Sequence, residues 1–388
     1  MTYTNPILKA FSPGGSETPG AGICYHSLLV RDLGMQARGT PWWHALSPEM
    51  PLRIARARDI INTFGLDWYQ LGPDAPRLER EGTLEERDGR VAFVRASDGA
   101  ICELYAPVPG GGDSGQYYHD VYAAAACPAS VGDVNRLVPP VDRPFDRAAF
   151  EASGQADFPK AFAEHFPEVA RVMHVNGPLW SLFGTMGYET VLILMAEAPA
   201  LIEQAAANRL THALAGVEMC AACGAQIVWI EECMMDQMHP DLYRAINAPL
   251  IRTLTAAIHE QGMKSVYYFC GDPWPRFDTI CTLGFDALAL EEGKKGFSID
   301  IMDVVARVSG SFALAGNVDS CRHFMTGDAD ALRCEIERQW MAGQRNGGRF
   351  FMNTGSPVPP ECPEGLVAAY ARFAHGLSPD GRNGSGRR

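Results

Sequence analysis

The sequence has no run of apolar residues long enough to cross a membrane. A spanning helix needs about 18 to 20 such residues, and no stretch of the 388 residues reaches that length. The first fifteen residues, MTYTNPILKAFSPGG, have no basic stretch followed by an apolar core, which is the pattern of a secretory signal. These absences predict a cytoplasmic protein that does not associate with membranes.

Positive charge is also scarce. The chain has 33 Lys and Arg residues against 46 Asp and Glu residues, a formal net charge of -13. Proteins that bind DNA or RNA gain much of their affinity from cations placed against phosphates. The charge balance therefore argues against a nucleic-acid partner and favours a small-molecule substrate.

Two signatures of other protein classes are missing. No GxGxxG motif follows an early apolar run, so the mark of the dinucleotide-binding fold is absent. The eleven cysteines are an odd number without the close spacing of a secreted disulfide framework, which predicts reduced thiols. Cys220 and Cys223 have CxxC spacing, but they lie late in an expected helix and no second CxxC occurs, so packing is expected there.

What the chain does contain, from about residue 158 onward, is an alternation of short apolar runs with longer helical segments. The runs expected to form strands are 172–175, 227–230, 265–269, 287–290, 312–315 and 349–352. This repeating order predicts an α/β fold, a (β/α)8 TIM-type barrel over residues 151–377. Residues 1–150, rich in Gly and Pro, predict an N-terminal α+β extension, and 378–388 predict a disordered tail.

Functional side chains of such barrels follow the C-terminal ends of the strands. The polar residues that directly follow or end the apolar runs are Asn176, Glu231, Glu232, Cys270, Glu291, Asn317, Asp319 and Ser356. Cys270 and Glu291 follow two consecutive strands, so their side chains are expected to converge. Tyr268 alternates with Cys270 and is expected on the same side of its strand.

Taken in order, these segments resemble the uroporphyrinogen decarboxylase superfamily. The resemblance runs from about Val131 to Leu377, and its most specific pieces are NGP at 176–178, SVYYFCGD at 265–272, GFDALALEE at 284–292, LAGNVDS at 314–320 and GGRFFMNTGSPVPPECP at 347–363. The superfamily also contains zinc-dependent methyltransferases acting on corrinoids and thiols, and is related to cobalamin-independent methionine synthase. The arginine-bearing signature of uroporphyrinogen decarboxylase itself is absent near residues 23–38. The resemblance therefore favours the methyltransferase branch.

The zinc ligands of that branch are only partly present. The resemblance implies a His-x-Cys pair, a distant Cys and often a Glu, but Tyr268 stands in the His position and Ser356 in that of the distant Cys. Cys270 and Glu291 remain as metal ligands. Zinc sites that bind substrate usually have three protein ligands, and the sequence leaves the third open among Glu231, Glu232, Cys233, His239 and Cys362. Zinc-bound and metal-free forms thus both stay open.

The resemblance implies a one-carbon enzyme that moves a methyl or other small alkyl group from a corrinoid, methoxy or similar donor to a thiol or other acceptor. Zinc is the expected cofactor, and a corrinoid would be carried by a partner protein. Cys270 and Glu291 would hold the metal. The expected catalytic residues are Glu231, Glu232, Tyr268 and Asp319, and the expected substrate-binding residues are Asn176, Asn317 and Ser356. Adjacent carboxylates such as Glu231 and Glu232 can raise each other's pKa, which suits proton transfer.

Two alternatives remain. One is a metal-free decarboxylase or lyase of the same superfamily acting on a small carboxylate substrate, which the loss of two expected zinc ligands favours. The other is a non-catalytic partner of a corrinoid protein. The sequence leaves the oligomeric state open, with a homodimer as the commonest arrangement for enzymes of this size.

Overall fold

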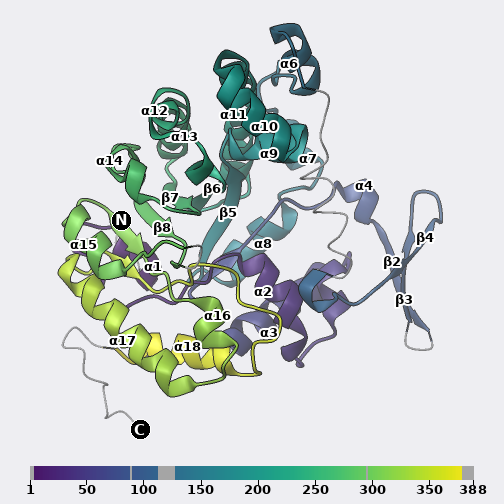
Figure 1. Cartoon of the computed structure of the whole chain (residues 1–388). Coiled ribbons are helices and arrows are strands. Elements are labelled where there is room, and N and C mark those ends of the chain that lie inside the picture. The colour runs from purple at the N-terminus through teal and green to yellow at the C-terminus, as the bar shows by residue number, and fades with distance from the viewer. Residues whose placement is uncertain (1–3, 88–89, 112–126, 294–295, 378–388) are drawn as a thin grey trace.

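The computed structural model describes residues 4–87, 90–111, 127–293 and 296–377 of the chain (Figure 1). The tail expected to be disordered, 378–388, lies outside these residues. No helix among them is long and apolar enough to cross a membrane.

The centre of the molecule is a seven-stranded sheet in which strands follow one another in chain order. The strands are β1 (Trp68–Gln70), β5 (Ala170–Asn176), β6 (Ile227–Glu232), β7 (Lys264–Phe269), β8 (Ala287–Leu290), β9 (Ala313–Ala315) and β10 (Phe350–Phe351). All neighbouring pairs are parallel. The predicted barrel fold is confirmed, and β1 comes from the first 150 residues.

A short N-terminal segment joins the two edges of this sheet. The amide of Met352, just after β10, donates to the carbonyl of Gly20 at 2.8 Å, and the amide of Gly22 donates to the carbonyl of Met352. On its other side, the carbonyl of Ala21 accepts from the amide of Asp67, just before β1. This segment therefore occupies the eighth strand position and closes the barrel.

Helices connect the strands and cover the outside of the barrel (Figure 1). Along the barrel region they are α6 (Val131–Leu137), α7 (Arg147–Ala152), α8 (Asp157–His165), α9 (Trp180–Met186), α10 (Tyr188–Glu197), α11 (Pro199–Ala222), α12 (Pro240–Leu242), α13 (Ala248–Glu260), α14 (Phe277–Ile280), α15 (Ile301–Val308), α16 (Ser320–Phe324), α17 (Ala329–Arg345) and α18 (Leu366–His375). In α15 the buried residues Ile301, Val304, Val305 and Val308 recur at helical spacing, so one apolar face packs on the sheet.

The interior of the barrel forms a second, smaller core of side chains that alternate along the strands. It includes Trp68, Val172, Trp229, Val266, Tyr268, Ala289 and Phe351. The helix α1 (Pro6–Ala10) contributes Ile7 and Leu8 to this core and is tied to the start of the strands, because the side-chain amide of Asn5 donates to the carbonyls of Asp67 and Glu168. The helix α1 thus closes the end of the barrel at which the strands begin, opposite their C-terminal ends.

The rest of the N-terminal region forms short helices and a projecting sheet, consistent with a mixed extension. The helices are α2 (His26–Leu33), α3 (Met50–Phe64) and α4 (Arg77–Arg80), with a 3-10 turn at Trp42–Leu46. The strands β2 (Gly82–Arg87), β3 (Arg90–Arg95) and β4 (Ile101–Leu104) pair antiparallel into an arm that extends away from the barrel (Figure 1).

Candidate active site

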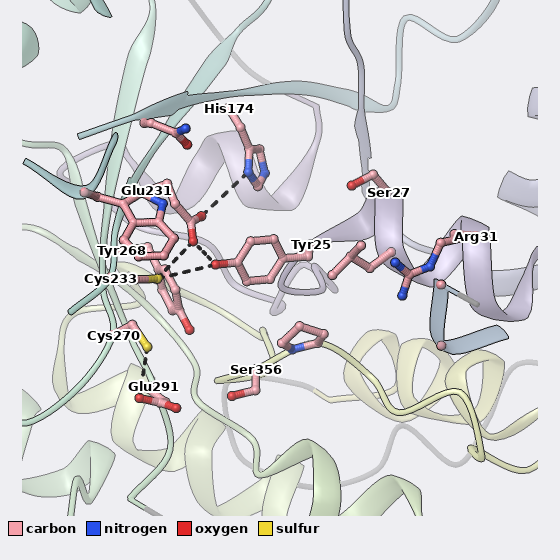
Figure 2. Close-up of a pocket in the computed structure, with 16 residues that line it drawn as sticks. Tyr25, Ser27, Arg31, His174, Glu231, Cys233, Tyr268, Cys270, Glu291 and Ser356 are labelled. Carbon is pink, nitrogen blue, oxygen red and sulfur yellow. Dashed lines mark hydrogen bonds and ion pairs between the residues drawn. The ribbon is translucent and has the colours of Figure 1, made fainter. Parts of the chain in front are cut away.

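The main pocket opens at the C-terminal ends of the barrel strands and has a volume of about 790 Å³. Side chains at or just after the C-terminal ends of β5, β6, β7 and β8 form its floor. Tyr25, which precedes α2, and Ser27, Leu28 and Arg31 of α2 form a wall (Figure 2). This is the end of a TIM-type barrel where catalytic residues gather.

Glu231 is the buried acid of this pocket. Trp229, Glu231 and the following Cys233 alternate along β6, so all three face the barrel interior. The Glu231 side chain accepts hydrogen bonds from Tyr25, from Trp229 Nε1 at 3.2 Å and from Cys233 Sγ at 3.2 Å. Burial raises the pKa of Glu231 to about 8, so the group is mostly protonated at neutral pH and is able to donate a proton.

Tyr25 is a contributor that sequence reasoning missed. Its backbone lies in the left-handed region, with φ of 54°, at the residue preceding α2. A bulky residue adopts this conformation at a cost of order 1 kcal/mol or more. The conformation directs the Tyr25 hydroxyl to Glu231 and to within 3.8 Å of Cys233 Sγ (Figure 2). No local sequence pattern marks such a position.

Cys270 and Glu291, which the sequence expected to converge, are in contact. The Cys270 thiol donates to Glu291 Oε2 at 3.1 Å. Glu231 of β6 pairs with Tyr268 of β7, so two residues further on Cys233 lies beside Cys270. This neighbouring thiol and burial raise the pKa of Cys233. The pocket floor therefore presents two adjacent thiols flanked by two carboxylates.

These donors suit zinc in chemistry. Within the described residues, no three His, Cys, Asp or Glu side chains are gathered into a ready metal cluster. The chain of contacts from Glu291 through Cys270 to Cys233 nevertheless supplies one carboxylate and two thiols, the donor types that Zn²⁺ prefers. Of the five residues considered for the third ligand, Glu231 and Cys233 line the pocket, and Cys233 is the one that touches Cys270. The donor types are those of a zinc site with Cys233 as the third ligand, although the three side chains are not gathered closely enough among the described residues to form one.

Glu232 faces the opposite side of β6 and does not line the pocket. It accepts from the backbone amide of Trp180 at 3.3 Å and from Asn247 Nδ2 at 3.0 Å. Burial raises its pKa to about 7. A Cβ at Gly177 would lie 2.5 Å from Glu232 Oε1, so a side chain at 177 would displace the Glu232 carboxyl group. Glu232 thus links the start of α9, which follows β5, to the residue that precedes α13.

Asn317 and Asp319 also lie outside the pocket lining. The Asp319 carboxylate accepts from the amide of Arg322 at 2.8 Å and so caps the start of α16. Asn317 Nδ2 donates to the carbonyls of Ile299, at 3.1 Å, and Glu291, at 3.4 Å. Asn317 is therefore placed to support the backbone of Glu291 instead of contacting a substrate in the main pocket.

Tyr268, Asn176 and Ser356 do line the pocket. The Tyr268 hydroxyl donates to the carbonyl of Gly355 at 2.8 Å, which links β7 to the loop after β10. The Ser356 hydroxyl donates to Glu292 Oε2 at 2.8 Å. The residues that stand in the two expected zinc-ligand positions thus both make hydrogen bonds within the protein.

Arg31 is the one Lys or Arg among the described residues that line the pocket. Its guanidinium forms two hydrogen bonds to Asp32, at 2.6 and 2.8 Å, so its charge is already balanced. His174 also lines the pocket, and burial lowers its pKa to about 3, so it is neutral. The described lining therefore has no cluster of cations that would bind several carboxylates at once.

A parallel β/α barrel with buried acids and thiols at the strand termini has the architecture of a TIM-barrel enzyme. Residues 144–377 match the family model described as uroporphyrinogen decarboxylase (URO-D). The chain belongs to this family, as the resemblance in the sequence indicated.

Solved structures are similar to the chain at low sequence identity, and the first of them shares its fold. A methyltransferase from Methanosarcina mazei is 18% identical, with 96% of this chain and 98% of that chain covered and a TM-score of 0.57. An AP endonuclease of family 2 from Brucella melitensis is 11% identical over 62% of this chain and 93% of its own, with a TM-score of 0.38. No curated protein matches the chain.

Proposed function

We propose that the protein transfers a methyl or other small alkyl group from a donor to a thiol acceptor bound in the main pocket. The observation that carries the proposal is the pair of adjacent thiols, Cys233 and Cys270, between Glu291 and a protonated Glu231. Membership of the URO-D family and a fold shared with a methyltransferase from Methanosarcina mazei support it.

Cys233, Cys270 and Glu291 would hold a zinc ion. When bound, zinc would keep a thiol acceptor ionised at neutral pH, which makes it a nucleophile. The donor would be a methylated corrinoid on a partner protein or a methoxy compound.

The chain's own residues would handle the leaving group. In the transfer, the acceptor sulfur forms a bond to the alkyl carbon, and the bond from that carbon to the donor atom breaks, its electron pair staying on the donor. For a methoxy donor the leaving oxygen takes a proton, and Glu231 carries one at neutral pH. Tyr25 and Trp229 hydrogen-bond the Glu231 carboxyl and hold it in place.

Decarboxylation of a substrate with many carboxylates is disfavoured by the charge of the pocket. Such a substrate needs several cations, and the described lining offers only Arg31, which is paired with Asp32. A metal-free lyase acting on a small carboxylate is supported by one observation, the protonated Glu231, because an acid at this position is able to protonate a carbanion.

Metal content and methyl transfer test the proposal together. We expect about one zinc per chain after growth with added zinc, and loss of most of it in Cys270→Ser, Cys233→Ser and Glu291→Gln. Cys321→Ser, which changes an exposed thiol outside the pocket lining, is the matched control. The zinc-loaded protein should demethylate methylcobalamin in the presence of 2-mercaptoethanol, followed by the absorbance of the cobalamin.

Two results would contradict the proposal. A zinc content far below one ion per chain in the wild type would contradict the proposed zinc site. If the zinc-loaded protein transfers no methyl group to the thiol from methylcobalamin or from a methoxy aromatic compound, the proposed alkyl transfer is wrong. That result would favour the metal-free lyase.

A further inference from the structure

A second, smaller cavity adjoins the main pocket. It has a volume of about 220 Å³ and lies between the end of β5 and the helices α9 and α11. His174 and Asn176 line both cavities, so the two meet at the end of β5. From α11, Arg209, His212, Ala213 and Gly216 recur at helical spacing and form one wall.

Arg209 in this wall has no carboxylate partner. Within the described residues no Asp or Glu offsets its charge, and none lines the cavity. One of its terminal nitrogens donates to Thr185 Oγ1, while Nε is buried without any hydrogen-bond partner. Burial alone lowers the pKa of Arg209, with no carboxylate offsetting it.

A half-buried guanidinium with an unsatisfied donor costs free energy unless an anion balances it. Of the groups that line the cavity beside Arg209, Asn176 is an amide and burial keeps His174 uncharged. The ring of His212 hydrogen-bonds the carbonyl of Pro139 through Nε2 at 2.7 Å, which fixes its orientation. One cation in a small cavity suits an anion with one charge.

We propose that this cavity binds a carboxylate group of the substrate through Arg209, while the other end of the same molecule reaches the thiols of the main pocket past His174 and Asn176. The inference rests on the proposed function for the reacting end but not for the anion site itself. It narrows the substrate to a small molecule with a carboxylate at one end and the alkyl-donating or alkyl-accepting group at the other.

Binding of simple anions tests the site without any turnover or metal. Propionate, propionamide and inorganic phosphate are titrated into the protein and followed by calorimetry. We expect millimolar binding of propionate, no binding of propionamide, which has the same shape without the charge, and weaker binding of phosphate. Arg209→Gln should weaken propionate binding at least about tenfold, and Arg209→Lys should weaken it less, because the charge is kept.

Arg171→Gln is the matched control for this variant. Arg171 is at the opposite end of β5, and burial alone lowers its pKa, as for Arg209, but its Nε donates to the carbonyl of Gly224. We expect Arg171→Gln to bind propionate like the wild type. The inference would be overturned if Arg209→Gln bound propionate as tightly as the wild type does. It would also be overturned if the wild type bound propionamide as tightly as propionate. Binding of phosphate without binding of propionate would show that the site takes a phosphate group and not a carboxylate.

Methyl transfer then connects the two proposals. Wild-type protein should prefer 3-mercaptopropionate, a thiol with a carboxylate, over 2-mercaptoethanol through a lower KM, and Arg209→Gln should lose the preference. If neither thiol accepts a methyl group but propionate binding depends on Arg209, the proposed function fails and the anion site stands.

Discussion

Glu231 and Glu232 are neighbours in the sequence but face opposite sides of β6. Glu231 contacts Tyr25, Trp229 and Cys233 in the pocket, and Glu232 contacts Asn247 in the helical shell. Strand alternation dictates that only one of two adjacent side chains faces the interior. The sequence predicted the pair but not which one, because that choice depends on the register of the strand.

The pKa of Glu231 predicts a dependence of stability on pH. The folded value of about 8 lies above the ordinary value of 4.5. The stabilisation that follows from this shift is fully present below about pH 4.5 and is lost as pH rises through about 8, at a rate of up to about 1.4 kcal/mol per pH unit. Urea unfolding between pH 5 and 9 should show Glu231→Gln gaining stability relative to the wild type as pH rises.

Glu260→Gln, which changes an exposed carboxylate, is the control and should follow the wild type at every pH. A difference between wild type and Glu231→Gln that does not change with pH would mean that Glu231 is ionised in the folded protein.

Tyr25→Phe removes the hydroxyl that contacts Glu231 and Cys233 but keeps the ring contacts with His174 and Tyr268. We expect alkyl transfer to fall at least about tenfold, since the acid loses a group that holds it, with a change in unfolding free energy of about 1 kcal/mol or less. Steady-state rates and urea unfolding measure the two effects. Tyr105→Phe, at an exposed tyrosine, should change neither the rate nor the unfolding free energy. A wild-type rate in Tyr25→Phe would show that the Tyr25 hydroxyl has no part in alkyl transfer.

At the scale of elements, the long and strongly patterned segments were predictable. The expected strand at 287–290 coincides with β8, and the expected strands at 172–175 and 227–230 lie within β5 and β6. The three residues of β1 and the segment 20–22 were not recognised, because so few residues show no periodicity. Tyr25 and Arg31 reach the pocket from this unrecognised region.

Some of the polar residues predicted at the strand ends line the pocket, and others do not. Cys270 and Glu291 converge because each directly follows its strand. Asp319 lies further along its loop and begins a helix, where its carboxylate caps α16. Strand-end position therefore predicted Cys270 and Glu291, but it did not distinguish Ser356, which follows β10 and lines the pocket, from Asn317, which follows β9 and does not.

The helix α1 supplies a test of how the barrel interior is sealed. Ile7 is fully buried in the interior core, so Ile7→Ala should lower the unfolding free energy by about 2 to 4 kcal/mol. Lys9→Ala, on the exposed side of the same helix, should change it by less than about 0.5 kcal/mol. Urea unfolding at neutral pH distinguishes them. Equal stability of the two variants would show that α1 is not part of the cooperative core.

Over the whole molecule, the barrel and the arm differ in how deeply they are buried. In the strands of the arm, Val91 is the one buried residue among the side chains that the structure describes. Local opening costs less where few apolar groups are buried. We expect amides of β2, β3 and β4 to exchange with deuterium within minutes and those of β6 and β7 to take hours, as measured by mass spectrometry. Equal protection would indicate that another surface covers the arm.

The closure of the barrel by the segment 20–22 sets an order on biosynthesis. The hydrogen bonds between Gly20, Gly22 and Met352 join residues far apart in the sequence, so the last gap in the barrel stays open until Met352 has left the ribosome. Contacts so distant in sequence form slowly, and an open parallel sheet exposes unpaired edges in the meantime. Premature termination before β10 would therefore release a chain with two exposed edges, a substrate for chaperones or proteases.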